Sequence, residues 1–275
     1  MKTGQVEHIS IQKINAGEIT KANDLVVIEE PLQIQLAYST ATGRLQKDIA
    51  VTMRTPGNDE ELAAGFLYTE GIIKTKEVLQ EIKHPSFDEN RVLVTLYENV
   101  QPDLANVARN FYSTSSCGIC GKASIEAIRI VSLCGQEKDT ISLNASVLYR
   151  LQDDLKKQVV FDRTGGIHAS ALFSLEGSCI MLREDVGRHN ALDKIIGAAL
   201  IGGQLPLRNC ILFLSGRAGF ELVQKAVMAG IKIIAAVGAP SSLAVEMAEE
   251  AGITLIGFLR NNRFNIYSGD QRIVL

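Results

Sequence analysis

The first third of the chain alternates apolar and polar positions with a period of two, which is typical of strands that bury one face. Pro31 separates the first two of these runs. We therefore expect a smaller β-rich N-terminal part over residues 1–112. Its predicted strands are residues 25–28, 32–38, 49–53 and 92–97.

One helix is predicted between these strands. It opens after Thr55, Pro56 and Gly57, and its apolar side chains recur at helical spacing. We expect Asn58 to cap this helix and Glu61, three residues later, to complete a capping-box pair. The predicted helix closes at Gly71.

After residue 142 the pattern changes to strands that alternate with helices. Such an alternation predicts right-handed crossovers and a mainly parallel sheet that is covered by helices on both faces. We predict an α/β domain over residues 142–275, α+β for the chain as a whole, joined through a mobile loop and linker at 113–141. The expected strands are 180–182, 210–214, 232–237 and 254–258, and the expected helices are 143–157, 187–200, 220–228 and 243–250, with Gly230 and Gly252 ending the last two.

Composition narrows the class of protein. Hydrophobic residues make up 46% and charged residues 21% of the 275 positions, so the chain can bury a core. A formal charge of −3 gives no reason to expect nucleic-acid or membrane-surface binding. No apolar run approaches the roughly 18–20 residues of a spanning helix, and the first residues lack the apolar stretch of a secretory signal. We expect a cytoplasmic protein.

The five cysteines fall into two groups. An odd number without an export signal predicts reduced thiols rather than a disulfide framework. Cys179 and Cys210 lie in apolar runs and Cys134 follows a predicted helix, so we expect all three to be buried structural thiols. Cys117 and Cys120 instead lie in a stretch of Gly, Ser and Thr without periodicity.

Two thiols in a flexible loop can share a proton, hold half a metal site or relay a sulfur atom. A four-thiolate zinc site needs a second pair, and the sequence has none at suitable spacing. A thioredoxin-like motif needs a strand directly before the first cysteine, where this chain has Ser and Thr. We predict that Cys117 and Cys120 act as nucleophiles, and an inert or structural thiol pair is the alternative.

A second candidate is His168, which follows Gly165 and Gly166 where we expect a helix to begin. A zinc deaminase would have His-x-Glu here and a Pro-Cys-x-x-Cys segment later. This chain has neither the Glu nor the thiol pair, so a deaminase-like scaffold is compatible with the sequence and deaminase chemistry is not. The alternative is a helix-capping or hydrogen-bonded core histidine.

The densest polar cluster is Arg183–Lys194, which follows a strand and starts a helix. We expect Asp185 to cap that helix and Arg188 and His189 to lie on its first turn. Ligands of parallel sheets bind outside the carboxyl ends of the strands, so this stretch is a candidate edge of a binding site. A solvated, well-capped helix start with ion pairs is the alternative.

Three further loops have the residues of an anion site. Ser215–Gly219 and Val237–Ser242 are rich in small residues and lie between a buried strand and a helix, where backbone N–H groups can hold phosphate. Phe258–Phe264 follows the last predicted strand and contains two Arg and two Asn, which suit a phosphate-rich ligand. Neither of the first two loops matches a P-loop or a dinucleotide fingerprint, and a plain surface turn is the alternative for the third.

Taken in order, these segments resemble the FdhD family, the formate dehydrogenase accessory sulfur-transfer proteins. The resemblance implies a cytidine-deaminase-like larger domain, with a mixed sheet, helices on both faces and no catalytic zinc. It also implies a sulfurtransferase that acts as a persulfide sulfur carrier, a homodimer, and two partners, a cysteine desulfurase and formate dehydrogenase. The matching stretches are Thr55–Gly71, Ser115–Gly121, Phe161–Ala169, Arg183–Lys194, Leu214–Gly219 and Phe258–Ser268.

The resemblance assigns roles residue by residue. Cys117 would bear the persulfide and Cys120 would assist or resolve it. The sulfur would go to the molybdenum bis-molybdopterin guanine dinucleotide cofactor, which GDP-like nucleotides are expected to mimic. The residues expected to bind this acceptor are Phe258, Leu259, Arg260, Asn261, Asn262 and Arg263, together with Gly216, Arg217 and His189.

Two other functions stay open. A binding and insertion chaperone for the cofactor would need neither thiol. A thiol–disulfide oxidoreductase would form a reversible Cys117–Cys120 disulfide.

Overall fold

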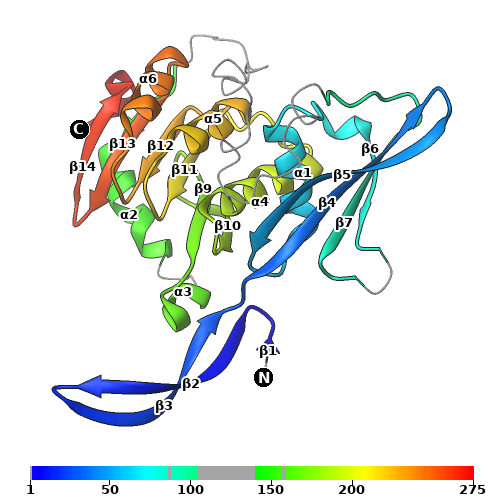
Figure 1. Cartoon of the computed structure of the whole chain (residues 1–275). Helices are drawn as coiled ribbons and strands as arrows, with labels where there is room; N and C mark the ends of the chain where they lie inside the picture. Colours follow the sequence, from blue (N-terminus) through cyan, green and yellow to red (C-terminus); the bar gives the residue numbers. More distant parts are fainter. Residues whose placement is uncertain (1, 86–87, 105–139, 156–158) are drawn as a thin grey trace.

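The structure is a computed structural model, and it describes residues 2–85, 88–104, 140–155 and 159–275 (Figure 1). Two large sheets dominate it. A four-stranded sheet in the order β5-β4-β7-β6 belongs to the N-terminal part, and a six-stranded sheet in the order β10-β9-β11-β12-β13-β14 belongs to the C-terminal part. Helices α1 and α4 lie between them (Figure 1).

The four-stranded sheet consists of β4 (Glu30–Thr40), β5 (Gly43–Arg54), β6 (Leu79–Lys83) and β7 (Arg91–Leu96), with the short helix η1 (Lys76–Val78) before β6. Alternate residues of its strands, such as Leu32, Ile34 and Val92, are fully buried. The period-two pattern predicted this, and β4, β5 and β7 contain three of the four predicted strands.

Helix α1 (Asp59–Thr69) ends as predicted, because Gly71 has a φ of 74°. Its predicted capping box is wrong. Asn58 has the left-handed conformation and its side chain makes no capping hydrogen bond. Glu61 instead binds Arg183, whose Nη2 lies 2.8 Å from Glu61 Oε1, because a long-range ion pair is available to its carboxylate.

The six-stranded sheet is mixed. Strands β11 (Cys210–Leu214), β12 (Ile233–Ala236) and β13 (Thr254–Arg260) are parallel. Strands β9 (His168–Ser174), β10 (Cys179–Asp185) and β14 (Arg263–Ser268) run antiparallel to their neighbours. The mixed sheet expected from the family resemblance is confirmed. The mainly parallel sheet expected from the alternation of strands and helices is only partly correct, because short hairpin turns join β9 to β10 and β13 to β14 without a crossover.

Strand β9 also corrects the expectation that a helix begins at His168. All residues from Ala169 to Phe173 are buried. A short apolar run of this kind does not separate a buried strand from a buried helix by periodicity. Burial on both faces of the sheet decides for the strand.

Helices cover both faces of this sheet, as predicted. On one face α4 (Arg188–Ile201), α5 (Phe220–Met228) and α6 (Ser242–Glu250) pack against residues such as Leu212 and Leu214. On the other face α2 (Ala145–Leu155) packs against Ile211 and Phe213. The C-terminal segment adds η3 (Asp270–Arg272) and β15 (Ile273–Val274), which pairs with β8 (Leu143–Asn144).

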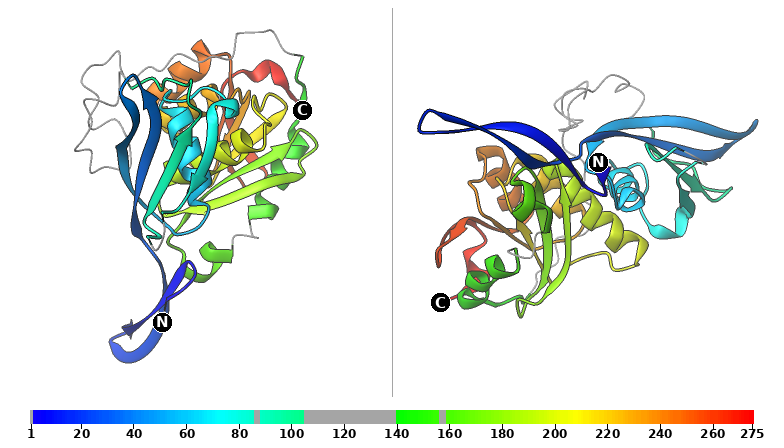
Figure 2. Two further views of the ribbon diagram at one scale, coloured as in Figure 1. Left: turned by 90° about the vertical axis from the view of Figure 1, so that its right-hand side faces the viewer. Right: turned by 90° about the horizontal axis from the view of Figure 1, so that it is seen from below.

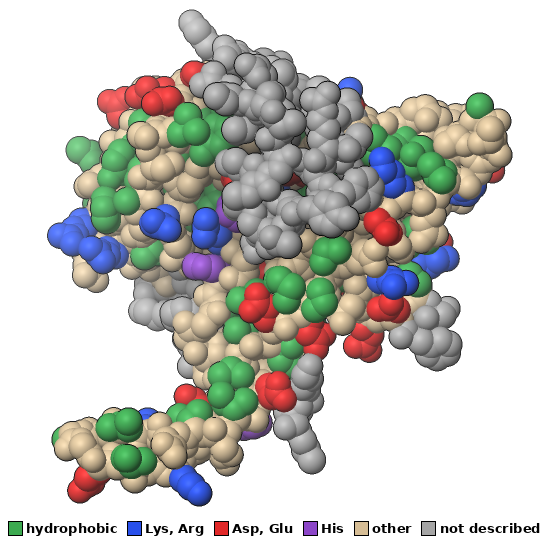
Figure 3. Space-filling model, viewed as in Figure 1, with side chains coloured by type: hydrophobic (Ala, Val, Ile, Leu, Met, Phe, Trp, Pro, Cys, Tyr) green, Lys and Arg blue, Asp and Glu red, His purple; other side chains and the backbone are tan. Residues whose placement is uncertain are grey.

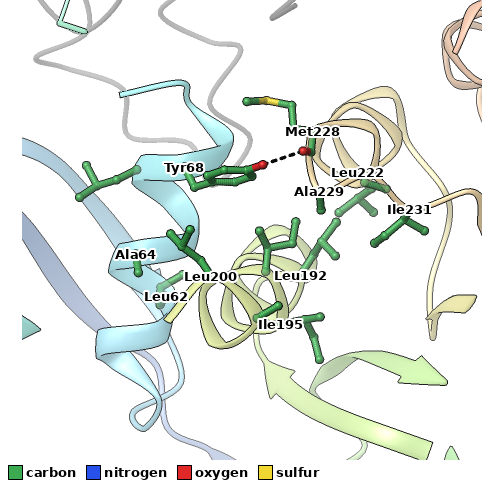
Figure 4. Close-up of a cluster of buried hydrophobic side chains, with 14 of the residues drawn as sticks. Leu62, Ala64, Tyr68, Leu192, Ile195, Leu200, Leu222, Met228, Ala229 and Ile231 are labelled. Carbon is green, nitrogen blue, oxygen red and sulfur yellow. Dashed lines mark hydrogen bonds between the residues drawn. The ribbon is translucent and has the colours of Figure 1, made fainter. Parts of the chain in front are cut away.

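The two parts share one core. Leu62 and Tyr68 of α1 lie against α4 and α5, and the Tyr68 hydroxyl donates to the carbonyl of Met228 at 2.8 Å (Figure 4). The helices cross at Gly65 and Gly197, and a Cβ at Gly197 would lie only 1.8 Å from the carbonyl oxygen of Glu61. The division into 1–112, 113–141 and 142–275 stays a prediction, since 105–139 lie outside the described residues.

A hairpin arm projects from the molecule (Figures 1 and 2). It consists of β1 (Lys2–Thr3), β2 (Val6–Asn15) and β3 (Glu18–Val27), of which the sequence pattern predicts only the last part. Its base packs against the described part of the C-terminal half, where Val6 contacts Val160 of α3 (Val159–Thr164) and Ile167. Among the described residues, no helix has both the length and the apolar character to cross a bilayer.

Candidate functional site

The ends of three parallel strands meet at one edge of the six-stranded sheet. The loop after β11 and the loop after β12 are tied together, because the Gly238 N–H donates to the carbonyl of Gly216 at 3.0 Å. The Phe258 N–H, near the end of β13, donates to the carbonyl of Gly238 at 3.1 Å. The sequence-predicted loops at 215–219, 237–242 and 258–264 are therefore neighbours at the carboxyl edge.

Two glycines permit this close approach. A Cβ at Gly216 would lie 3.4 Å from Nδ1 of His168, at the start of β9. A Cβ at Gly238 would lie 3.0 Å from both the Gly216 carbonyl and Cγ of Arg217. A side chain at Gly238 would therefore push the two loops apart, whereas at Gly216 it would press on the imidazole.

The turn between β10 and α4 completes this edge. Asp185 is fully buried, and its carboxylate accepts hydrogen bonds from the Gly187 N–H at 2.8 Å and from Asn190 Nδ2 at 3.1 Å. Its ion pair with Lys194, also fully buried, measures 2.7 Å. Burial raises the pKa of Asp185, and the Lys194 ammonium opposes that shift. Asp185 is thus part of a buried ion pair. The prediction that it caps α4 is wrong, because the N-cap is Gly187.

Thr55, just before α1, forms hydrogen bonds with the same buried ion pair and with Val186. Its N–H donates to Asp185 Oδ2 at 3.2 Å, its hydroxyl accepts from the Val186 N–H at 3.1 Å, and its carbonyl accepts from Lys194 Nζ at 3.0 Å. Two of the matching sequence stretches, Thr55–Gly71 and Arg183–Lys194, are therefore in contact. Much of this polar cluster holds the two parts of the molecule together, and it is not solvated as the alternative interpretation required.

His189, a predicted acceptor-binding residue, is buried on the first turn of α4. Its Nε2 lies 2.9 Å from Oε2 of Glu221 on the first turn of α5. Glu221 was not found by sequence reasoning, although its place directly after the 215–219 loop was the available signal. Nearby, Lys225 pairs with Asp193 at 2.9 Å, and this ion pair raises the pKa of Lys225 although burial acts against it.

His168 lies at the same edge and is half-buried. Burial lowers its pKa, Arg188 and His189 act in the same direction, and Asp185 opposes them. The structure thus brings His168, Gly216 and the start of α4 together, which the sequence alone does not establish.

The hairpin between β13 and β14 places basic groups at the far end of this edge. Asn261 and Asn262 have φ values of 52° and 55°, as a tight two-residue turn requires. They and the flanking Arg260 and Arg263 are exposed. The space-filling view shows Lys and Arg side chains at this end of the sheet and His side chains on the same face (Figure 3).

The rest of the predicted binding set is less accessible. Leu259 is buried in the core, and its carbonyl accepts a hydrogen bond from Gln152. Phe258 is half-buried, whereas Arg217 is exposed on the loop after β11. The exposed part of the set that could contact a phosphate is therefore Arg217, Arg260 and Arg263 with the two asparagines.

The cysteine predictions have different outcomes. Cys117, Cys120 and Cys134 lie outside the described residues, so their roles stay predictions. Cys179 is exposed at the start of β10, which corrects the expectation that it is buried. Cys210 is half-buried, and burial raises its pKa. Within the described ranges no three His, Cys, Asp or Glu side chains are grouped closely enough to hold a metal ion.

Comparisons with known proteins find similarity over nearly the full length of the chain. The family model of the FdhD/NarQ family matches residues 27–274. A protein of Mycolicibacterium paratuberculosis named sulfur carrier protein FdhD is 48% identical, over 96% of this chain and 97% of its own. One of the same name from Sulfolobus acidocaldarius is 43% identical, over 98% of this chain and 100% of its own.

A solved structure has the same fold. It is a crystal structure from Desulfotalea psychrophila, provisionally described as a formate dehydrogenase accessory protein, with a TM-score of 0.76 and 25% identity. The match covers 98% of this chain and 100% of that one. Since the family model and these relatives span nearly the full length, the chain belongs to the FdhD/NarQ family.

Proposed function

We propose that this protein is a sulfur carrier that relays persulfide sulfur from a cysteine desulfurase to the molybdenum bis-molybdopterin guanine dinucleotide cofactor, before the cofactor enters formate dehydrogenase. The observation that supports this most directly is near-full-length similarity to proteins named as sulfur carriers. The chain also has the thiol pair that such a role needs, at Cys117 and Cys120.

The carboxyl edge of the six-stranded sheet suits the acceptor. The guanine nucleotide arms of the cofactor contain pyrophosphate, and planar guanidinium groups bind phosphate through paired hydrogen bonds. Arg217, Arg260 and Arg263 are exposed along this edge. The Gly238 N–H already donates to the Gly216 carbonyl, so the guanidinium groups are the phosphate-binding donors in this proposal.

The chemistry needs two thiol steps. The Cys117 thiolate attacks the outer sulfur of the desulfurase persulfide, the sulfur–sulfur bond breaks, and the desulfurase cysteine leaves as a thiolate. The Cys120 thiolate then attacks the inner sulfur of the Cys117 persulfide. A Cys117–Cys120 disulfide forms, and the outer sulfur leaves as hydrosulfide for the acceptor. An external thiol reductant reopens the disulfide, so atoms and electrons balance.

Peptide mass spectrometry tests the first step. The full chain is incubated with a cysteine desulfurase and cysteine, with and without reductant. We expect a reductant-sensitive gain of one sulfur atom on Cys117, lost in Cys117→Ala and retained in Cys179→Ala, which removes an exposed thiol elsewhere. Sulfur loading of Cys117→Ala equal to that of the parent would overturn the proposal.

The second candidate is a cofactor chaperone without thiol chemistry. Its supporting observation is that the basic edge of β13–β14 is built by described residues, independently of the cysteines. A chaperone predicts that Cys117→Ala and Cys120→Ala both still activate formate dehydrogenase in a reconstituted assay. A sulfur carrier predicts that Cys117→Ala does not.

The homodimer, the cytoplasmic location and the cytidine-deaminase-like ancestry of the larger domain belong to the same proposal. They rest on the family resemblance. Light scattering of the purified chain tests the oligomeric state, and a mass equal to one chain at working concentration would remove the homodimer from the proposal.

A further inference from the structure

His168 has no role in the thiol chemistry above, yet its position ties it to the candidate acceptor site. It is the first residue of β9 and pairs in register with Asp185 of β10. On the other side the loop after β11 passes so closely that a Cβ on Gly216 would lie 3.4 Å from its Nδ1. The imidazole therefore lies beside the loop after β11, at the carboxyl edge of the six-stranded sheet.

Two carboxylates at this edge of the sheet already have partners. Asp185, from β10, is paired with Lys194 at 2.7 Å. Glu221, from α5, is paired with His189 of α4 at 2.9 Å. The Asp185 carboxylate offsets the positive groups around His168 only in part, because it is already paired with Lys194.

The positive groups nearby are not balanced in this way. Arg188 lies on the first turn of α4 and is half-buried, and Arg217 follows Gly216 and is exposed. Among the described side chains, neither Arg188 nor Arg217 has an ion-pair partner. The edge thus has a surplus of positive charge that an anion would neutralise.

We propose that His168 takes up a proton when a phosphate-bearing ligand binds at this edge, so that the site binds diphosphates more tightly as the pH falls. The inference rests on the proposed function, in which the edge holds the pyrophosphate of the cofactor arms.

The physical reason is a reversal of the local charge balance. In the free protein, burial and then Arg188 and His189 lower the pKa of His168, so the imidazole is neutral near pH 7. A bound pyrophosphate offsets the charge of Arg188 and Arg217 and can accept a charge-assisted hydrogen bond from the imidazolium. Both effects raise the pKa of His168 in the complex.

Linkage then sets the pH dependence. Protons are taken up on binding wherever the pH lies between the pKa of His168 in the free protein and its value in the complex. The dissociation constant rises by up to about tenfold per pH unit across that window and levels off above it. A site without a linked histidine would show no such rise for a ligand that does not itself titrate.

The test uses GDP-mannose, whose pyrophosphate is a diester and does not titrate between about pH 5 and 8, the range in which histidine does. Isothermal titration calorimetry at one pH in two buffers of different ionisation enthalpy measures the protons taken up per site. We expect uptake of a large fraction of one proton by the parent and almost none by His168→Gln. The matched control, His8→Gln on the exposed arm, should behave as the parent does.

The outcomes separate this inference from the proposed function. If GDP-mannose binds and His168→Gln takes up as many protons as the parent, the inference is overturned while nucleotide binding stands. If GDP-mannose does not bind, the pH titration of the His168 ring in the parent is followed by NMR with and without inorganic pyrophosphate. An upward shift of that titration supports the inference and counts against the guanine dinucleotide, and no shift overturns both.

Discussion

The crossing of α1 and α4 offers a sharp test of the fold, at Gly197. A Cβ there would lie 1.8 Å from the carbonyl oxygen of Glu61 and 2.7 Å from the backbone nitrogen of Gly65. The obstacle on the facing helix is backbone, so no side chain can rotate away. Gly197→Ala must therefore separate two helices that belong to the shared core of both parts.

The size of the effect follows from that separation. An ordinary contact distance of about 3.4 Å requires the helices to move apart by about 1.6 Å, and a gap of even 0.5–1 Å already loses a quarter to a half of each dispersion contact. Leu62, Leu192 and Ile195, all fully buried, lie along this interface. We expect the free energy of unfolding to fall by about 3–5 kcal/mol. This net figure exceeds the usual cost of overpacking and already includes a gain of about 1 kcal/mol in helix propensity.

Thermal and urea unfolding of the full chain, followed by circular dichroism, measures this loss. The melting temperature should fall by about 10 °C. Gly219→Ala is the matched control, since its φ is −83° and nothing lies within 4 Å of the added Cβ. Gly219 is the N-cap of α5, where Ala is less favourable than Gly, so its stability should fall by no more than about 1 kcal/mol. A Gly197→Ala protein within about 1 kcal/mol of the parent would refute this account of the crossing.

Three further predictions follow from charged residues. Lys194→Met should lower the free energy of unfolding by about 3–5 kcal/mol, because it leaves the Asp185 carboxylate buried without its cation. Adding Asp185→Asn should recover part of that loss in urea unfolding, and no recovery would argue against the Asp185–Lys194 pair. Arg260→Ala and Arg263→Ala should each weaken GDP binding and its dependence on salt, as measured by calorimetry, without changing the melting temperature; unchanged binding would remove the β13–β14 hairpin from the site. Because the pKa of His168 is lowered in the folded protein, the unfolded chain protonates this imidazole more readily, so the protein loses stability as the pH falls below about 6.5. His168→Gln should reduce that loss, and a pH profile of unfolding equal to that of the parent would contradict this prediction.

The sequence by itself determined several elements of the C-terminal part. β11 and α5 have the predicted bounds, because strand and helix are marked there by uninterrupted local patterns. Gly230 and Gly252 end helices with φ values of 78° and 63°, which their lack of a Cβ allows without strain. These features depend on neighbours along the chain, so a local pattern is sufficient to predict them.

Only the tertiary structure decided what the polar residues do. Glu61 and Asp185 have the local spacing of caps, yet each finds a partner that local spacing does not reveal: Arg183 for Glu61, and both Lys194 and Thr55 for Asp185. Likewise, His168 begins a strand and lies against Gly216, far along the chain. A charged side chain can find hydrogen-bond partners in many places, and burial determines which of these partners it pairs with. That burial exists only once α1, α4 and the two sheets have packed together.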